Sequence, residues 1–173
     1  MGRRVALACG IVASVLYIAM NVFIPMQWEG YSLASQAVSE LSAIGAPTRQ
    51  LWVPLGLAYN VLMVAFGWGV LASASGNRRL RIAGSLLIAS GVNGLLWPPM
   101  QLRGTEFALT DALHIAFTVV ALVLMFLEIG FGAAALDRRF RLYSIATIVV
   151  FVVCGALTFA DAPKLAANLP TPW

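Results

Sequence analysis

Charged residues are scarce in this sequence. Only 10% of its 173 residues are Asp, Glu, Lys or Arg, whereas 61% are hydrophobic. Soluble domains carry roughly 25% charged residues, and a soluble fold of this length could not hide so much apolar surface. The formal net charge is +4, but the basic residues separate apolar stretches and form no basic face. The composition therefore excludes a soluble globular domain and argues against a nucleic-acid partner.

Cysteine and histidine are also rare. Cys9 and Cys154 lie inside apolar stretches, which is typical of small buried hydrophobic residues rather than of a disulfide or a metal-binding pair. His114 is the only histidine, so the chain cannot supply two axial haem nitrogens. No glycine-rich loop follows a strand and precedes a helix, as a nucleotide-binding loop requires. The sequence therefore predicts no organic cofactor.

Long apolar stretches are what the sequence does contain. Each of five such stretches is long enough to cross a bilayer once, which takes roughly 20 residues, and none is long enough to cross twice. They lack the period-two alternation of barrel strands, so the backbone must satisfy its hydrogen bonds by forming helices. The sequence predicts an all-α, polytopic transmembrane bundle in one domain, 1–173. Its five spans are expected near residues 5–27, 52–73, 81–98, 111–135 and 142–160.

Most basic residues fall on one side of the predicted bundle. If the spans alternate in direction, eight of the 11 Lys and Arg residues lie on the side of the N-terminus. By the positive-inside rule that side is the cytoplasm. We therefore predict a multi-pass protein of the cell membrane with a cytoplasmic N-terminus. The eight residues are Arg3, Arg4, Arg78, Arg79, Arg81, Arg138, Arg139 and Arg141, while Trp28, Trp52 and Trp97 lie at the opposite ends of the spans.

The segment between the first two spans shows a helical pattern of its own. Four apolar residues recur in it at helical spacing, Gly45 is placed to cap a helix, and Pro47 prevents the helix from continuing. We predict an amphipathic helix over residues 31–46, lying on the outer end of the bundle. The apolar stripe consists of Leu33, Ala37, Leu41 and Ile44.

Part of this segment resembles a known family. The stretch from Val38 to Arg49, followed by Leu51-Trp52, resembles the signature of a bacterial and archaeal membrane family known as domain of unknown function 998. Asp111-Ala112-Leu113-His114, at the start of the fourth span, is similar to that family's second patch. The resemblance runs along the whole chain and implies a membrane bundle, usually of six spans, without an established activity. A sixth span would then be either lost or outside this sequence.

Four ionisable residues are predicted to meet at the outer end of the bundle: Glu40, Asp111, His114 and Asp161. Asp111 and His114 are three residues apart, on one face of a helix, and we expect Glu40 to point toward them. Such a group could carry acid–base chemistry, and Glu40, Asp111 and His114 could hold a divalent cation. The alternatives are structural: Asp111 caps the helix, and His114 is the hydrogen-bonded partner of a nearby acid.

A second set of polar residues lies at membrane depth. Glu128 falls inside the fourth span, and ionisable groups there are costly and often functional. It is expected to be protonated, to pair with Asn60 or Asn93 from neighbouring spans, or to face a protein partner. The functional alternative is a proton relay. Asn21, Asn60 and Asn93 lie in one span each, which favours hydrogen bonds between helices.

Three functions remain open. The first is a small structural or accessory membrane protein, whose partners would be membrane lipid and either other subunits or a second copy of the chain. It rests on the short loops and the lack of a strong catalytic motif. The second is a membrane-embedded enzyme acting on a lipid-like substrate at the outer leaflet, through the four ionisable residues. The third is a proton-coupled transporter, which rests on Glu128.

Overall fold

The computed structural model describes residues 2–102 and 104–160. These residues form α-helices and two short 3-10 helices, and no β-strand, so the all-helical prediction is confirmed. A chain this apolar reaches that result because a helix satisfies its backbone hydrogen bonds internally. The α-helices are α1 (Arg3–Phe23), α2 (Arg49–Ala72), α3 (Arg78–Leu95), α4 (Leu109–Ala135) and α5 (Arg138–Ala160), and the 3-10 helices are η1 (Pro25–Gln27) and η2 (Val38–Ser42).

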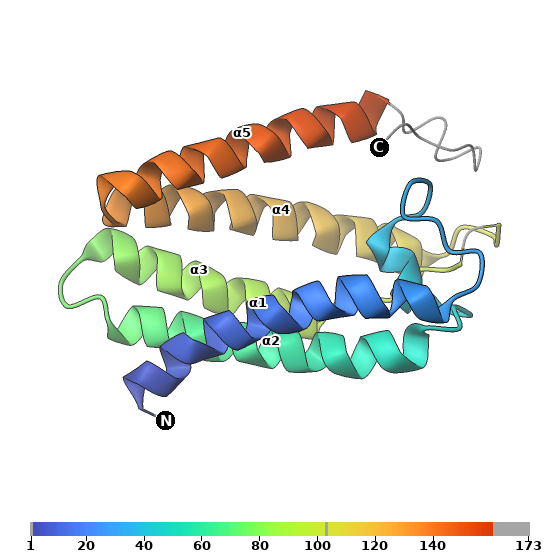
Figure 1. The fold of residues 1–173 in the computed structure, drawn as a ribbon, viewed down its shortest axis with the longest axis horizontal. Helices are drawn as coiled ribbons and strands as arrows, with labels where there is room; N and C mark the ends of the chain where they lie inside the picture. The colour runs from blue at the N-terminus through green and yellow to red at the C-terminus, as the bar shows by residue number, and fades with distance from the viewer. Residues whose placement is uncertain (1, 103, 161–173) are drawn as a thin grey trace.

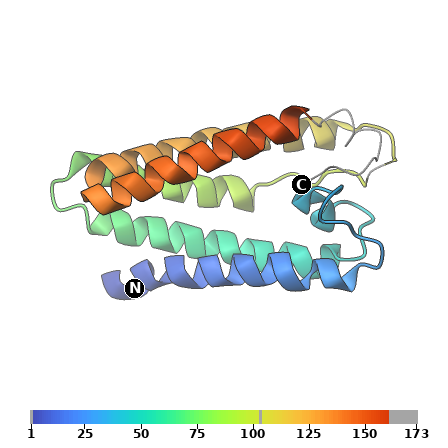
Figure 2. The same cartoon turned by 45° about the horizontal axis from the view of Figure 1, so that its top comes forward.

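The α-helices lie side by side and alternate in direction (Figures 1 and 2). α1 packs on α2, α2 on α3, α3 on α4, and α4 on α5. The starts of α1, α3 and α5, which carry the basic residues, therefore share one end of the bundle (Figure 1). The connections 24–48 and 96–108 lie at the opposite end. This is the alternation that the basic residues predicted, and the assignment of the basic end to the cytoplasm stays a prediction.

Asparagine and aspartate set where two of these helices begin. Asn77 Oδ1 accepts a hydrogen bond from the backbone N–H of Leu80 at 3.1 Å, before α3. Asp137 Oδ1 accepts one from the backbone N–H of Phe140 at 2.9 Å, before α5. Both contacts satisfy backbone donors that a helix start leaves without a partner. α3 and α5 consequently begin at their first arginines, a few residues before the uncharged stretches from which the spans were predicted.

Within the part of the chain that the structure describes, four helical segments are long and apolar enough to cross a membrane. α3 does not meet that standard, because three of its 18 residues are arginines in its first turn. It still lies between α2 and α4, so five crossings stay a prediction. The four segments are Arg3–Gln27, Arg49–Ala72, Leu109–Ala135 and Arg138–Ala160.

Glycines bring α2 and α3 close together. A Cβ atom added at Gly84 would lie 2.7 Å from the backbone nitrogen of Leu71, and one added at Gly91 would lie 2.9 Å from the backbone nitrogen of Val64. Backbone atoms cannot move aside as flexible side chains can, so larger residues at these positions would separate the helices. α3 is thus fixed against α2, which determines which of its side chains face the inside of the bundle.

The structure corrects the prediction of a continuous helix over residues 31–46. This segment consists of turns around η2, and Gly45 has a left-handed backbone with φ of 92°. Leu33 is 73% exposed whereas Leu41 is fully buried, so the expected apolar stripe does not face one surface. Polar side chains that bond to nearby backbone N–H groups compete with a regular helix, and the contacts described below are of this kind.

Candidate functional site

Two connections join into one layer at the end of the bundle opposite the basic residues. The backbone N–H of Ile44 donates to the carbonyl of Met100 at 2.8 Å, and Ile44 and Gln101 form an isolated parallel bridge. Leu41 and Ala43 are fully buried beneath these contacts. We call this layer, residues 28–48 together with 96–102 and 104–108, the loop cap.

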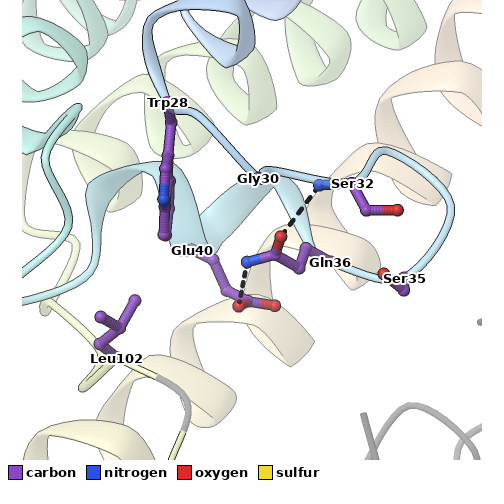
Figure 3. Close-up of a pocket in the computed structure, with 7 residues that line it drawn as sticks. All are labelled: Trp28, Gly30, Ser32, Ser35, Gln36, Glu40 and Leu102. Atoms are coloured by element: carbon purple, nitrogen blue, oxygen red, sulfur yellow. Dashed lines mark hydrogen bonds between the residues drawn. The ribbon is translucent and has the colours of Figure 1, made fainter. Parts of the chain in front are cut away.

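Glu40 is held within the loop cap by local hydrogen bonds. Its side chain is 1% exposed. One carboxylate oxygen accepts from the backbone N–H of Ala37 at 2.9 Å, and the other accepts from Gln36 Nε2 at 3.2 Å. Figure 3 shows Gln36 between Glu40 and Ser32, whose backbone N–H donates to Gln36 Oε1 at 2.9 Å. These residues line a hollow of about 320 Å³ together with Trp28, Gly30, Ser35 and Leu102.

Asp111 joins the start of α4 to the loop cap. Its Oδ1 accepts from the backbone N–H of Gln101 at 2.7 Å, and its Oδ2 accepts from the backbone N–H of Ala108 at 2.8 Å. Both carboxylate oxygens thus serve backbone donors, one of them at the helix start, where an acid is favoured. The sequence left open whether Asp111 takes part in acid–base or metal chemistry or caps α4. The geometry supports the helix cap.

His114 is fixed between α3 and α4. Its side chain is 7% exposed, and its Nδ1 lies 3.0 Å from Trp97 Nε1 and 2.9 Å from the carbonyl oxygen of Pro98. An indole can only donate and a carbonyl can only accept, so a neutral imidazole satisfies one of these contacts at a time. The Trp97 and His114 rings meet edge-on, with centroids 5.2 Å apart. The partner of His114 is thus an indole or a carbonyl, where an acid was predicted.

The three described members of the predicted cluster, Glu40, Asp111 and His114, are not placed to hold a metal ion together. Within residues 2–102 and 104–160, no three His, Cys, Asp or Glu side chains are placed to hold a metal ion. The hydrogen bonds of Asp111 and His114 go to other groups than Glu40. Asp161 lies outside the described residues. Of these acids, Asp111 joins two backbone segments and Glu40 bonds within its own segment.

A larger hollow lies inside the bundle, among α1, α2, α3, α4 and η2. It measures about 560 Å³, which is within the range of small-molecule sites. We call it the bundle cavity. Its walls are aromatic, aliphatic and methionine side chains with a few polar groups. The polar lining residues are Ser39, Ser42 and Arg49 near the loop cap, and Tyr17, Tyr59, Asn60, Ser90, Asn93 and Glu128 farther along the helices.

Glu128 is the only acidic residue among those that line the bundle cavity. Its Oε1 accepts a hydrogen bond from the hydroxyl of Ser90, which projects from α3. α4 rises about 1.5 Å per residue, so Glu128 lies roughly 10 Å along the helix from its end at Ala135. No basic side chain of the described residues pairs with it. A carboxyl group is therefore placed inside the bundle with one hydroxyl partner.

The asparagines do not pair with Glu128 as predicted. Asn60 Nδ2 donates to the carbonyl of Gly56 at 2.9 Å, and Asn21 Nδ2 donates to that of Tyr17 at 2.8 Å, both within their own helices. Asn93 Nδ2 donates to the carbonyl of Phe117 at 3.4 Å and so joins α3 to α4. The rotation of α3 about its own axis places Ser90, and not Asn93, opposite Glu128. This is why the predicted pairing between asparagine and Glu128 is wrong.

Arg49 lies at the other end of the bundle cavity. It is the first residue of α2, and its guanidinium donates to the carbonyl of Ser42 in η2. Beside it, Thr48 Oγ1 donates to the carbonyl of Leu41 at 2.8 Å. Asn60 is 11 residues farther along α2, so roughly 16 Å of helix separates it from Arg49. The cavity thus has a cation near the loop cap and an acid deep inside.

Most residues that line the cavity are not predicted from the sequence as site residues. Arg49 precedes the predicted second span, and Ser90, Tyr17 and Tyr59 lie within spans without being predicted to line a site. The usable signal was the recurrence of polar residues inside apolar spans, which also identified Glu128. That signal identifies the polar residues, but it does not show whether a side chain faces the cavity, a neighbouring helix or lipid.

Comparison with known proteins gives one match. A family described as "Protein of unknown function (DUF998)" matches residues 11–170. No curated protein matches the chain, and no solved structure does.

Proposed function

This chain belongs to the DUF998 family of unknown function, and we propose that it is a proton-coupled carrier that binds its substrate in the bundle cavity. Its apolar helices make it an integral membrane protein. The observation that supports the proposal is the position of Glu128 on the wall of a cavity of about 560 Å³. An ionisable group at membrane depth costs free energy. Such groups are therefore rare, and those that occur usually have a function.

The contact between Glu128 and Ser90 suits a group that gains and loses a proton. A hydroxyl can donate to a carboxylate and can accept from a carboxylic acid. Ser90 can therefore remain hydrogen-bonded to Glu128 in either state. The charged state is costly at this depth without a counter-charge, so a bound cation and a bound proton would compete for the same carboxyl group.

The contacts in the loop cap give less support to an enzyme at the outer leaflet. Asp111 uses both carboxylate oxygens on backbone N–H groups, and Nδ1 of His114 faces an indole and a carbonyl. A general base must be within reach of the proton that it removes. These two residues are instead occupied in joining α3, α4 and the loop cap.

An accessory role is a second candidate, and α5 favours it. α5 packs on α4 at the edge of the bundle, and among its residues only Ser144 is buried. Such a surface suits either lipid or a second membrane protein. Purification from native membranes in a mild detergent distinguishes these cases. Recovery of a stoichiometric partner would support the accessory role, and recovery of the chain alone would contradict it.

Labelling at a matched pair of positions on α3 tests the carrier. Ser90 lines the bundle cavity, whereas the neighbouring Ala89 is exposed on the outside of the bundle. In a chain with Cys9 and Cys154 replaced by alanine, Ser90→Cys should react with a charged thiol reagent added to either side of sealed vesicles. Ala89→Cys, which faces lipid, should not react. Reaction of Ser90→Cys from one side only, or from neither, would contradict a carrier.

A further inference from the structure

We infer that the bundle cavity takes an amphiphilic organic amine, whose protonated nitrogen binds at Glu128 while its apolar part lies along the helices. The inference rests on the proposed function, because it names the substrate class of the same cavity. It is carried by the sign and number of the charges, by the aromatic rings beside them, and by the volume.

The charge in the deep part of the cavity selects a single positive charge. Glu128 is the only carboxyl group among the described lining residues, and one carboxylate suits a monovalent cation better than a divalent metal ion, which takes several oxygen ligands. Its neighbour Ser90 adds a hydroxyl oxygen. A protonated amine supplies the counter-charge and the hydrogen-bond donors that these oxygen atoms accept.

Aromatic rings extend this preference. The rings of Tyr17 and Tyr59 line the cavity with centroids 5.1 Å apart, and Glu128 lines the same cavity. The faces of aromatic rings attract cations within about 6 Å. Trp52 and Trp97 line the part of the cavity nearer the loop cap. An organic cation would therefore find favourable surfaces from the cap to the acid.

The remaining walls suit an apolar body. Leu57, Met63, Leu95 and Met125 line the cavity between its two charged ends. Methionine side chains adapt to ligands of different shape. A volume of about 560 Å³ accommodates a drug-sized molecule. The ligand is thus a small amphiphile with room for one ring system or a short chain.

Arg49 decides the orientation of such a ligand. Its guanidinium lies near the loop cap, roughly 16 Å of helix from the level of Asn60. Repulsion from Arg49 and attraction by Glu128 both drive a cationic nitrogen toward the deep end. An anionic amphiphile would take the opposite orientation, with its acid at Arg49, and the experiment below separates the two.

Three probes with one carbon frame test the inference on the purified full chain in lipid nanodiscs. Phenylbutylamine, phenylbutanol and phenylbutyrate present an amine, a neutral hydroxyl and an acid, and quenching of tryptophan fluorescence or equilibrium dialysis reports their binding. We expect the amine to bind tighter than the other two by about tenfold or more, as a desolvated charge pair allows. Equal binding of amine and alcohol would overturn the inference, as would the absence of binding by all three. Preference for the acid, lost in Arg49→Gln, would also overturn it.

Variants connect the preference to one residue. Glu128→Gln should abolish the preference for the amine, Glu128→Asp should keep it in weaker form, and Glu106→Gln, which changes an exposed carboxylate of the loop cap, should leave it unchanged. A preference that survives Glu128→Gln would overturn the assignment. Binding is measured here without transport, so its failure is distinct from failure of the carrier. Amine binding without two-sided labelling of Ser90→Cys would leave the ligand class standing and contradict the carrier.

Discussion

Glu40 in the loop cap and Asp111 beside it at the start of α4 accept hydrogen bonds from backbone N–H groups, whereas in the bundle cavity Glu128 accepts from a side-chain hydroxyl. A carboxylate that serves backbone donors fixes where the chain turns, and removing it leaves those donors without a partner. A carboxyl group with one hydroxyl partner in a cavity determines little of the fold. The comparison teaches that acids of one chain can have opposite roles, and that the hydrogen-bond partners of each acid indicate its role.

The strongest way to break this comparison is to remove the acid that caps α4. Asp111→Ala deprives the backbone N–H groups of Gln101 and Ala108 of their acceptor. We expect the free energy of unfolding to fall by about 2–4 kcal/mol, measured by denaturant titration of the full chain in detergent micelles. Asp111→Asn keeps one acceptor oxygen and should lose about half as much. If Asp111→Ala left the free energy of unfolding unchanged, this result would contradict the structural role and restore the catalytic interpretation.

A smaller effect is expected where the loop cap meets α2. Thr48 is 2% exposed, and its hydroxyl donates to the carbonyl of Leu41 at 2.8 Å. Thr48→Val keeps the shape and removes this bond, so the free energy of unfolding should fall by about 1 kcal/mol. The matched control is Thr147→Val on α5, whose hydroxyl bonds within its own helix. If the free energy of unfolding falls by the same amount in both variants, the buried hydrogen bond of Thr48 stabilises the fold no more than the bond within α5 does.

The cavity acid should behave in the opposite manner. Glu128→Gln keeps an oxygen acceptor for Ser90 and removes the ionisable group, so stability should change by less than about 0.5 kcal/mol or rise. Uptake of the amine into proteoliposomes, driven by a pH gradient, should be lost. Unfolding titration and uptake are measured on the same preparation, with Glu106→Gln as the control. Full uptake by Glu128→Gln would remove the basis of the proposed function.

The sequence predicted the membrane helices well because their signal is one-dimensional. α1, α4 and α5 follow from apolar stretches bounded by charged residues, and length alone decides that each is one helix. α3 was harder, since its three arginines lie inside the helix. The segment 31–46 failed for a different reason. Its apolar residues recur at helical spacing, but Glu40 and Gln36 bond to nearby backbone N–H groups, and periodicity does not report that competition.

The partners of the polar residues could not be predicted from spacing. Glu128 meets Ser90 because α3 is fixed against α2 through Gly84 and Gly91, which sets the rotation of α3. The sequence indicates that a polar residue lies at membrane depth but not which neighbour it faces. His114 shows the same limit. Its ring meets Trp97, which follows α3 and was predicted only as a residue of the membrane interface.

The smallest expected effect concerns His114 and tests how firmly the loop cap fixes its side chains. Nδ1 lies between one group that donates, Trp97 Nε1, and one that accepts, the carbonyl of Pro98. We expect the wild type to hold Nδ1 without a proton, accepting from the indole, because the Trp97 N–H would otherwise lose its hydrogen bond to His114. A carbonyl tolerates the loss of a bond better than an N–H does. In Trp97→Phe the donor is gone, and the proton should move to Nδ1 and bond to Pro98. One hydrogen bond replaces another, so stability should fall by no more than about 1 kcal/mol.

Nitrogen NMR of the imidazole reads the tautomer directly, and the signal needs no assignment since His114 is the only histidine. The same tautomer in both proteins would show that the indole does not control the ring, and that the loop cap holds His114 less firmly than its two contacts indicate.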